Sequence, residues 1–288
     1  MRQIFLTNRK NNMTTLNVIS LGAGVQSSVM ALMAAHGELP RPDCAIFADT
    51  QWEPQGVYDH LDWLESVVTN PLLVNNTFPI YRVTKGNIRQ AMIDGRGMNG
   101  DRFSSVPFFT SANGKSTMGQ RSCTVEYKIA PIRKKIRSLL GIKYRKKVPK
   151  GVIVNQWIGI STDEASRMKP AREKWLINTW PLIDAGMSRQ DCKQWFKERY
   201  PDRVLSKSAC IGCPFHNTAG WRDMKMNDPK SFADAVEVDI AIRDNGKNGN
   251  KQYMHTSLKA LSEVDFRNLE DKGQINMFEN ECEGMCGV

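Results

Sequence analysis

The sequence predicts an α/β fold with a doubly wound, mainly parallel sheet, followed by a smaller, mainly helical C-terminal portion. Short apolar runs at residues 16–21, 43–48 and 78–83 alternate with segments whose apolar residues recur at helical spacing. A glycine-rich turn follows the first run, and the pattern changes after about residue 170. Strands and helices that alternate in this way form parallel sheets covered on both faces, with ligands at the carboxyl ends of the strands.

The first unit reads as a strand, a glycine loop and a helix. Residues 16–21 are apolar and are followed at once by Gly22-Ala23-Gly24, which indicates a buried strand entering a tight turn. Apolar residues then recur at helical spacing until Gly37, which predicts a helix that ends there. The turn therefore lies at the carboxyl end of the first strand.

The later elements follow the same pattern. The expected strands lie at residues 43–48, 78–83, 152–160 and 175–180, and the expected helices at 54–68, 125–140 and 188–199. Ser188 is a candidate cap for the last of these helices. Residues 94–120 are rich in Gly, Ser, Asn and Phe without clear periodicity, which predicts a long loop. Polar residues follow two of the strands, as Asp49-Thr50 and as Ser161-Thr162-Asp163-Glu164.

We expect three regions along the chain: a polar leader at residues 1–15, a nucleotide-binding α/β domain at 16–170, and a cysteine-containing C-terminal portion with a tail at 171–288. The leader lacks the apolar core of a secretory signal. The apolar runs are far shorter than the roughly 20 residues that cross a bilayer. The sequence thus predicts a cytoplasmic protein without a membrane partner, and it does not predict an oligomeric state.

Composition favours a globular protein with thiol chemistry. With 41% hydrophobic residues, the chain falls outside the disordered and collagen-like classes. Its seven cysteines are poorly explained by disulfides, because cytosolic thiols stay reduced, so metal or redox chemistry is the better interpretation.

The chain is strongly basic, with a net charge of +10, and residues 133–150 hold nine Lys or Arg and no acid. An anionic partner, either a nucleotide or a nucleic acid, would explain this charge. A solvated basic helix face followed by a loop would explain it equally well. Both interpretations stay open.

Residues 22–28, called the glycine loop below, have the composition of an anion site. The candidate binding residues are Gly22, Ala23, Gly24, Gln26, Ser27 and Ser28. Backbone N–H groups and hydroxyls can converge there on an anion at a helix N-terminus. The loop matches neither common nucleotide fingerprint, because no Lys follows the glycines and a third glycine is missing. Spacing alone is equally compatible with a tight strand–helix turn.

Four segments decide between these interpretations. They are the run from Ser20 to Met30, Phe47-Ala48-Asp49-Thr50, Arg121-Ser122-Cys123-Thr124 with Lys128, and the run from Gly159 to Arg167. Together, and in this order, they resemble the adenine nucleotide alpha hydrolase (PP-loop ATP pyrophosphatase) superfamily, to which the phosphoadenosine phosphosulfate reductase family belongs. The first run resembles its pyrophosphatase loop, usually Ser-Gly-Gly-x-Asp-Ser. The resemblance covers residues 18–170.

The resemblance implies a Rossmann-like, HUP-type fold that binds ATP or phosphoadenosine phosphosulfate, with Mg²⁺. The glycine loop would hold phosphates, Asp49 and Thr50 would lie beside the adenosine, and Gly159 would belong to the nucleotide site. Asp163 and Arg167 would be catalytic and would reach the triphosphate or the acceptor. We therefore expect an enzyme that adenylates an acceptor, for sulfur transfer or nucleic acid modification, with cations and amides stabilising the departing pyrophosphate.

The glycine loop departs from the family pattern at two places. Gly22-Ala23 replaces the usual Ser-Gly, and Gln26 stands where an Asp is usual. A charged group close to the metal or the phosphates is therefore missing. Backbone binding of phosphate survives these changes, whereas cleavage between the α- and β-phosphates is put in question.

The cysteines suggest a second centre. Cys210-x-x-Cys213 is compatible with zinc, an iron–sulfur cluster or a dithiol pair. By the resemblance, Cys123 is a further ligand, and the tail offers Cys282 and Cys286. We expect Cys123, Cys210, Cys213 and Cys286 to hold a metal centre, with a 4Fe–4S cluster preferred over structural zinc.

The tail also partly resembles the Glu-Cys-Gly-x-His ending of sulfonucleotide reductases, in which a mobile thiolate attacks sulfur. This makes Cys282 a predicted catalytic residue. The His of that ending is missing here, and the neighbouring acids Glu281 and Glu283 disfavour a thiolate.

Three functions follow from these patterns: an ATP-dependent adenylating enzyme, a sulfonucleotide reductase, and a catalytically silent module that binds nucleotide or nucleic acid. The basic residues 133–150 and the tail favour the first. An adenine nucleotide is the expected partner throughout, with a nucleic acid acceptor and a sulfur donor or reductant protein for the enzymes.

Overall fold

The computed structural model describes residues 14–95, 105–112, 115–143, 146–205, 208–246 and 250–267. Its centre is a five-stranded parallel sheet in the order β3-β2-β1-β6-β7. The strands are β1 (Thr14–Leu21), β2 (Cys44–Asp49), β3 (Ile80–Thr84), β6 (Val152–Ile158) and β7 (Leu176–Thr179). The α/β class predicted from the alternating pattern is confirmed.

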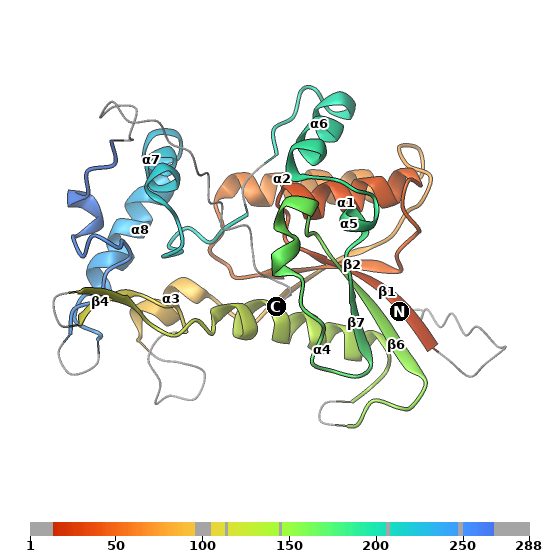
Figure 1. Ribbon diagram of the computed structural model, residues 1–288, viewed down its shortest axis with the longest axis horizontal. Coiled ribbons are helices and arrows are strands. Elements are labelled where there is room, and N and C mark those ends of the chain that lie inside the picture. The colour runs from red at the N-terminus through yellow and green to blue at the C-terminus, as the bar shows by residue number, and fades with distance from the viewer. Residues whose placement is uncertain are drawn as a thin grey trace.

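Helices cover both faces of this sheet (Figure 1). One face carries α1 (Val25–His36), α2 (Gln55–Val68), α5 (Pro181–Asp184) and α6 (Arg189–Arg199). The other face carries α4 (Ala130–Leu139), which continues the π-helical turn η1 (Thr124–Ile129). The sheet is therefore doubly wound, as expected.

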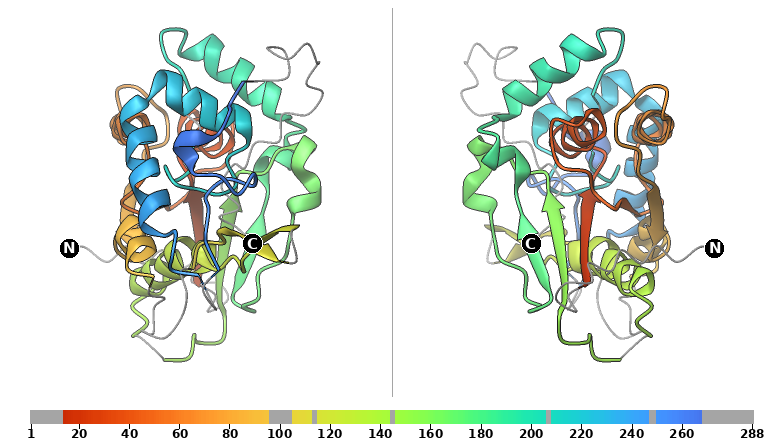
Figure 2. Two further views of the ribbon diagram at one scale, coloured as in Figure 1. Left: turned by 90° about the vertical axis from the view of Figure 1, so that its left-hand side faces the viewer. Right: turned by 90° about the vertical axis from the view of Figure 1, so that its right-hand side faces the viewer.

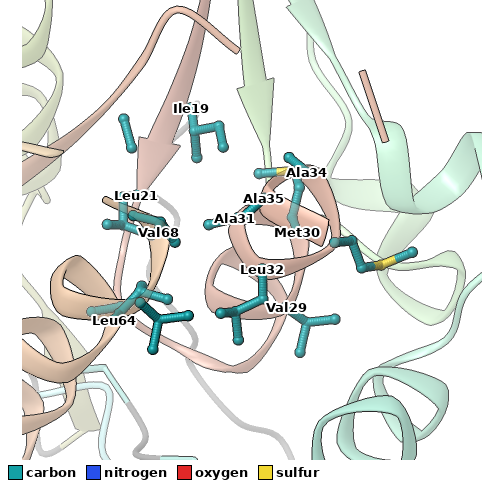
Figure 3. Packing of buried hydrophobic residues seen from close by; sticks show 14 of the residues in the cluster. Ile19, Leu21, Val29, Met30, Ala31, Leu32, Ala34, Ala35, Leu64 and Val68 are labelled. Atoms are coloured by element: carbon teal, nitrogen blue, oxygen red, sulfur yellow. The ribbon is translucent and has the colours of Figure 1, made fainter. Parts of the chain in front are cut away.

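The contact between α1 and the sheet is close because α1 is rich in small residues. Ile19 of β1 and Leu32 of α1 are fully buried in it, and Leu64 of α2 joins them (Figure 3). Each such side chain contributes roughly 1.5–3 kcal/mol of hydrophobic stabilisation. Gly37, with φ 87°, ends α1 in the left-handed conformation that glycine adopts most readily.

The order of the strands reverses direction at β1. β2 pairs with one edge of β1 and β6 pairs with the other, so the chain moves outward through β2 and β3 and then returns to the opposite side of β1. In open parallel sheets such a reversal opens a crevice at the carboxyl ends of the strands. The glycine loop follows β1 and the residues from Gly159 follow β6, so both begin at this crevice.

A second, mainly helical body contains α3 (Ile88–Ile93), α7 (Thr218–Asn227), α8 (Pro229–Ala241) and the turn η4 (Leu261–Glu263). The left-hand view of Figure 2 looks onto it, with the sheet behind. Its core includes the fully buried Trp221, together with Trp52 from the segment that follows β2. The helical C-terminal portion is thus confirmed.

Residues 94–120 are not wholly a loop, and that prediction was wrong. They contain a hairpin of β4 (Phe109–Ala112) and β5 (Lys115–Met118), and β4 also bridges to Tyr253. The hairpin was missed because its short strands lack an apolar alternation, and β5 is exposed along its whole length.

The sheet and its covering helices continue past residue 170, where the sequence placed the start of the second portion. β7, α5 and α6 all lie beyond that point, and α7 begins only at Thr218. β7 joins the sheet by parallel pairing with β6, from Val154↔Leu176 to Trp157↔Thr179. Within the residues described, no helix is both long and apolar enough to cross a membrane.

Candidate functional site

The glycine loop makes a tight turn between β1 and α1. Ala23 is left-handed, with φ 57°, and Gly24 is the extended N-cap of α1. The Ser27 hydroxyl accepts from the Gly22 N–H at 3.2 Å and donates to the Gly24 carbonyl at 3.4 Å. The loop therefore lies at the N-terminus of α1, where helix amides and the helix dipole favour an anion.

Gly159 is required by the close approach of two backbones. A Cβ atom at this position would lie 2.7 Å from the Ser27 nitrogen and 2.9 Å from the Ser27 Cα. The chain that leaves β6 is thus packed directly on the glycine loop. This contact brings together two of the segments that carry the family resemblance.

Gln26 is held at both ends of its amide, and its side chain is almost completely buried. Its Nε2 donates to Ser161 Oγ at 3.2 Å and to Glu164 Oε2 at 3.1 Å. Its Oε1 accepts from Arg189 Nη1 at 2.9 Å. Glu164 Oε1 in turn pairs with Arg167 Nη1 at 2.5 Å. Gln26 therefore links the glycine loop to a carboxylate and to two guanidinium groups.

Asp163 lies at the N-terminus of α6, where its Oδ1 accepts from the Arg189 N–H at 2.9 Å. Burial alone would raise the pKa of Asp163, but hydrogen bonds from Ser161 and from the Arg189 amide lower it below its usual value. The carboxylate is therefore ionised at neutral pH. It fixes the start of α6, and so the Arg189 side chain, beside the glycine loop.

Asp49 ends β2 and Thr50 follows it, at the edge of the sheet where the glycine loop lies. Asp49 Oδ1 accepts from the Gln51 N–H at 2.7 Å and from the Tyr58 hydroxyl at 2.9 Å. Thr50 is buried, and its hydroxyl donates to Glu53 Oε1 at 3.0 Å. Both predicted nucleotide residues thus lie at the carboxyl end of β2, the strand next to β1.

The segment that carries Cys210 and Cys213 packs on the glycine loop and on the turn that follows β2. The Ser208 hydroxyl donates to the Gly22 carbonyl, and the Ile211 N–H donates to the Trp52 carbonyl at 3.0 Å. Gly212 touches the Trp52 ring so closely that a Cβ atom there would lie 2.2 Å from it. These contacts bring the cysteine segment beside the glycine loop.

Cys210 lies in a polar cluster with the turn after β2. Its sulfur is 3.4 Å from Thr50 Oγ1 and 3.5 Å from Glu53 Oε1, and Lys128 Nζ is 3.8 Å from the same Glu53 oxygen. Burial, followed by the charge of Glu53, raises the pKa of the Cys210 thiol. Cys210 is therefore a protonated thiol at neutral pH, not a thiolate nucleophile.

The predicted metal centre is only partly within the described residues. Cys123 lies near enough to Cys210 to raise its pKa further, and the Cys213 N–H donates to the Cys210 carbonyl at 3.1 Å. The described residues do not assemble three His, Cys, Asp or Glu side chains at metal-binding spacing. Cys282 and Cys286 lie outside these residues. The cluster and its zinc alternative stay predictions.

The sequence interpretation missed three residues of this site: Glu53, His60 and Arg189. Glu53 could have been noticed, since it follows Thr50 by one short turn. Arg189 gave no local signal, because it reaches the loop only through the folding of α6 onto α1. Glu164 lies in the run from Gly159 to Arg167, but the sequence pattern predicted no role for its side chain.

His60 holds the Ser28 hydroxyl, with His60 Nε2 2.9 Å from Ser28 Oγ in the buried interior. Burial, with a contribution from the charge of Arg203, lowers the pKa of His60 to about 4. The imidazole is therefore neutral at pH 7. Ser28 thus has an interior partner on α2, in addition to its place at the start of α1.

The chain matches no protein-family model, and no curated protein matches it. The likeness to the PP-loop superfamily therefore rests on the four quoted segments.

Proposed function

We propose that this chain is a PP-loop-type, ATP-dependent enzyme that adenylates an acceptor, for sulfur transfer or nucleic acid modification. The observation that carries the proposal is the packing of Gly159 on Ser27 at the crevice between β1 and β6. A nucleotide in this crevice would meet the glycine loop on one side and residues 159–167 on the other. Parallel sheets with this strand order bind ligands at such crevices.

The electrostatics of the crevice support phosphate binding. Loop amides and the N-terminus of α1 would hold phosphate oxygens. Arg189, fixed by Asp163 and Gln26, supplies a guanidinium group beside the loop. Because Gln26 Nε2 also holds Glu164, a carboxylate lies one hydrogen bond away from the position where the family usually has an Asp.

The proposed reaction is transfer of the adenylyl group from ATP to the acceptor. An oxygen of the acceptor attacks the α-phosphorus, the bond from that phosphorus to the bridging oxygen breaks, and pyrophosphate leaves with the electron pair. Arg189 and the loop amides would stabilise the charge that develops on the departing pyrophosphate. Mg²⁺ supplies further positive charge when it accompanies ATP, and Glu164 and Asp163 are carboxylates of the kind it prefers.

The test is binding and turnover of ATP in the presence of Mg²⁺. We expect the wild-type chain to bind ATP and to release pyrophosphate when an acceptor is added. Arg189→Gln should weaken ATP binding by about 10- to 150-fold, because a charged hydrogen bond to phosphate is worth roughly 1.5–3 kcal/mol. The matched control is Arg199→Gln at the other end of α6, whose partner is Glu38, and it should bind ATP as the wild type does.

Other outcomes would replace the proposal. Sulfite release from phosphoadenosine phosphosulfate without pyrophosphate release from ATP would favour the reductase. A chain that binds ATP but turns over neither nucleotide would be the silent module. Equal loss of ATP affinity in Arg189→Gln and Arg199→Gln would show that Arg189 does not contact the phosphates of ATP.

A further inference from the structure

Two adjoining hollows lie on the α4 side of the sheet. Their volumes are about 810 Å³ and 210 Å³, and they share Val125, Ile129 and Arg133 as lining residues. The larger hollow lies between α4 and the loop that follows it, and the smaller lies between η1 and the chain that leads into β7. We call the pair the α4 groove.

The lining of the α4 groove is rich in cations, one of which, Arg133, is paired with Glu173 outside the lining. Its larger hollow is lined by Arg133, Lys134, Arg137, Lys143 and Lys146. The smaller hollow adds Lys169 and Arg172. No Asp or Glu occurs among the described lining residues of either hollow. This density of one sign of charge favours a polyanion.

A solvated basic helix face would look different, and α6 provides the comparison. Its exposed Lys193 and Lys197 are interleaved with Asp191 and Glu198, so that face carries both signs. The α4 groove is concave and has an apolar floor that includes Val125, Ile129 and Ile142. Of the two interpretations left open by the sequence, an anionic partner is therefore favoured.

Both sides of the α4 groove are held in place. Arg137 donates to the carbonyl oxygens of Lys143, at 3.3 Å, and of Lys146, which ties both of these lysines to α4. Arg133 pairs with Glu173 at 2.7 Å and so ties α4 to the chain that carries Lys169 and Arg172. The backbone segments that carry the cations are thus arranged before a ligand arrives, which lowers the entropic cost of binding.

The α4 groove leads toward the candidate site. Lys169 follows Arg167 by two residues, and Val125 follows Cys123 by two residues in the turn η1. Gln156 and Asn178, near the carboxyl ends of β6 and β7, line the smaller hollow. A chain that lies in the groove can therefore continue to the end of the sheet where the glycine loop lies.

We propose that the α4 groove binds the phosphate backbone of a single-stranded nucleic acid, which is the acceptor of the adenylation. The role as acceptor rests on the proposed function, whereas the binding itself does not. Phosphates would pair with the lysines and arginines of the rim, and sugars or bases would lie on the apolar floor. A single strand is favoured because its unpaired bases can lie on the apolar floor, whereas the bases of a duplex are paired and stacked with each other.

The experiment measures binding of fluorescent single-stranded RNA and DNA oligonucleotides, without ATP. The test variants are Lys143→Gln/Lys146→Gln and Lys169→Gln/Arg172→Gln. The control is Lys193→Gln/Lys197→Gln, which removes the same charge from α6. We expect each test pair to weaken binding about 10-fold and to reduce the salt dependence of log K by roughly 0.7 for each phosphate that is no longer neutralised. The control should change the affinity less than about 2-fold, as expected for charges outside the binding surface.

An equal effect of test and control variants would overturn the inference, because net charge alone would then explain binding. Tighter binding of a duplex than of either single strand would also overturn it. If the wild type ignores oligonucleotides yet releases pyrophosphate from ATP, the inference fails while the proposed function stands. If it binds oligonucleotides through the groove but ignores ATP, the groove stands and the proposed function fails.

Discussion

The glycine loop and the cysteine segment, residues 208–221, meet at one edge of the sheet but are stabilised differently. In the loop, Gln26 uses both ends of its amide and Ser28 bonds His60. Around the cysteine segment, buried atoms of Glu53, Arg121 and Trp221 have no hydrogen-bond partner among the described residues. An unmade bond of this kind costs about 1–3 kcal/mol. The polar side chains of the loop itself are thus bonded, whereas several buried polar atoms around the cysteine segment are not.

This difference indicates which region tolerates change. The loop is built on backbone contacts between core elements, so an added side-chain atom would overlap backbone that cannot shift by itself. The cysteine segment contacts its neighbours through backbone and side chains, and where Gly212 meets the Trp52 ring, a side chain can shift more readily than a backbone held between core elements. Substitutions in the loop should therefore lower the free energy of unfolding more than comparable substitutions in the cysteine segment.

The largest expected effect is that of Gly159→Ala. Its methyl group would overlap the Ser27 backbone, and relief requires β6 and α1 to separate. We expect the free energy of unfolding in urea to fall by about 3 kcal/mol, at the upper end of overpacking costs. Gly119→Ala is the control, because its nearest neighbour would be 3.5 Å away. Equal stability of the two variants would contradict the backbone contact at the loop.

An effect of similar size, but limited to acid, is expected from His60. Burial, with the charge of Arg203, lowers its pKa in the folded state from 6.5 to about 4, so the unfolded chain binds the proton more tightly. Stability from this group is present above pH 6.5 and is lost as the pH falls toward 4. The loss should reach about 3 kcal/mol, at 1.36 kcal/mol for each pKa unit.

The comparison is with His60→Gln, which can still bond Ser28 but does not titrate. Urea unfolding of both proteins between pH 7 and 4 should show a steeper decline in the wild type. Parallel curves would mean that His60 is protonated in the folded protein, and that the interior of the loop is more open than the structure shows.

The smallest effect of the three is expected for Gly212→Ala. A methyl group there would meet the Trp52 ring, whose Nε1 donates to Asp234 Oδ2 at 2.5 Å. The ring can move if that hydrogen bond lengthens, so we expect a loss of about 1–2 kcal/mol in urea unfolding. A loss larger than that of Gly159→Ala would reverse the ranking of the two regions.

Sequence patterns were sufficient to predict those helices, strands and caps whose geometry depends on residues close in sequence. The apolar run of β1, the glycines after it and the helical spacing in α1 gave the strand–loop–helix unit. Ser188 was identified as a cap from its residue type, and its side chain accepts from the Asp191 N–H in the structure. In each case residues close in sequence determine the geometry.

The rest depends on contacts between distant segments. β7 enters the sheet by pairing with β6, Arg189 reaches Gln26 across most of the chain, and Gly212 packs on Trp52. No periodicity or spacing encodes these pairs. For the same reason the four cysteines expected at one metal centre could be grouped only by resemblance.

The central claim is that the glycine loop binds the phosphates of an adenine nucleotide. The most direct measurement is a titration with ATP and Mg²⁺, followed through the backbone amide NMR signals of the protein. We predict that the largest shifts fall on the amides of residues 22–28, with smaller ones at Gly159 and Arg189, and that adenosine alone leaves the loop amides nearly unchanged. ATP binding that shifts other amides and leaves residues 22–28 in place would contradict the claim.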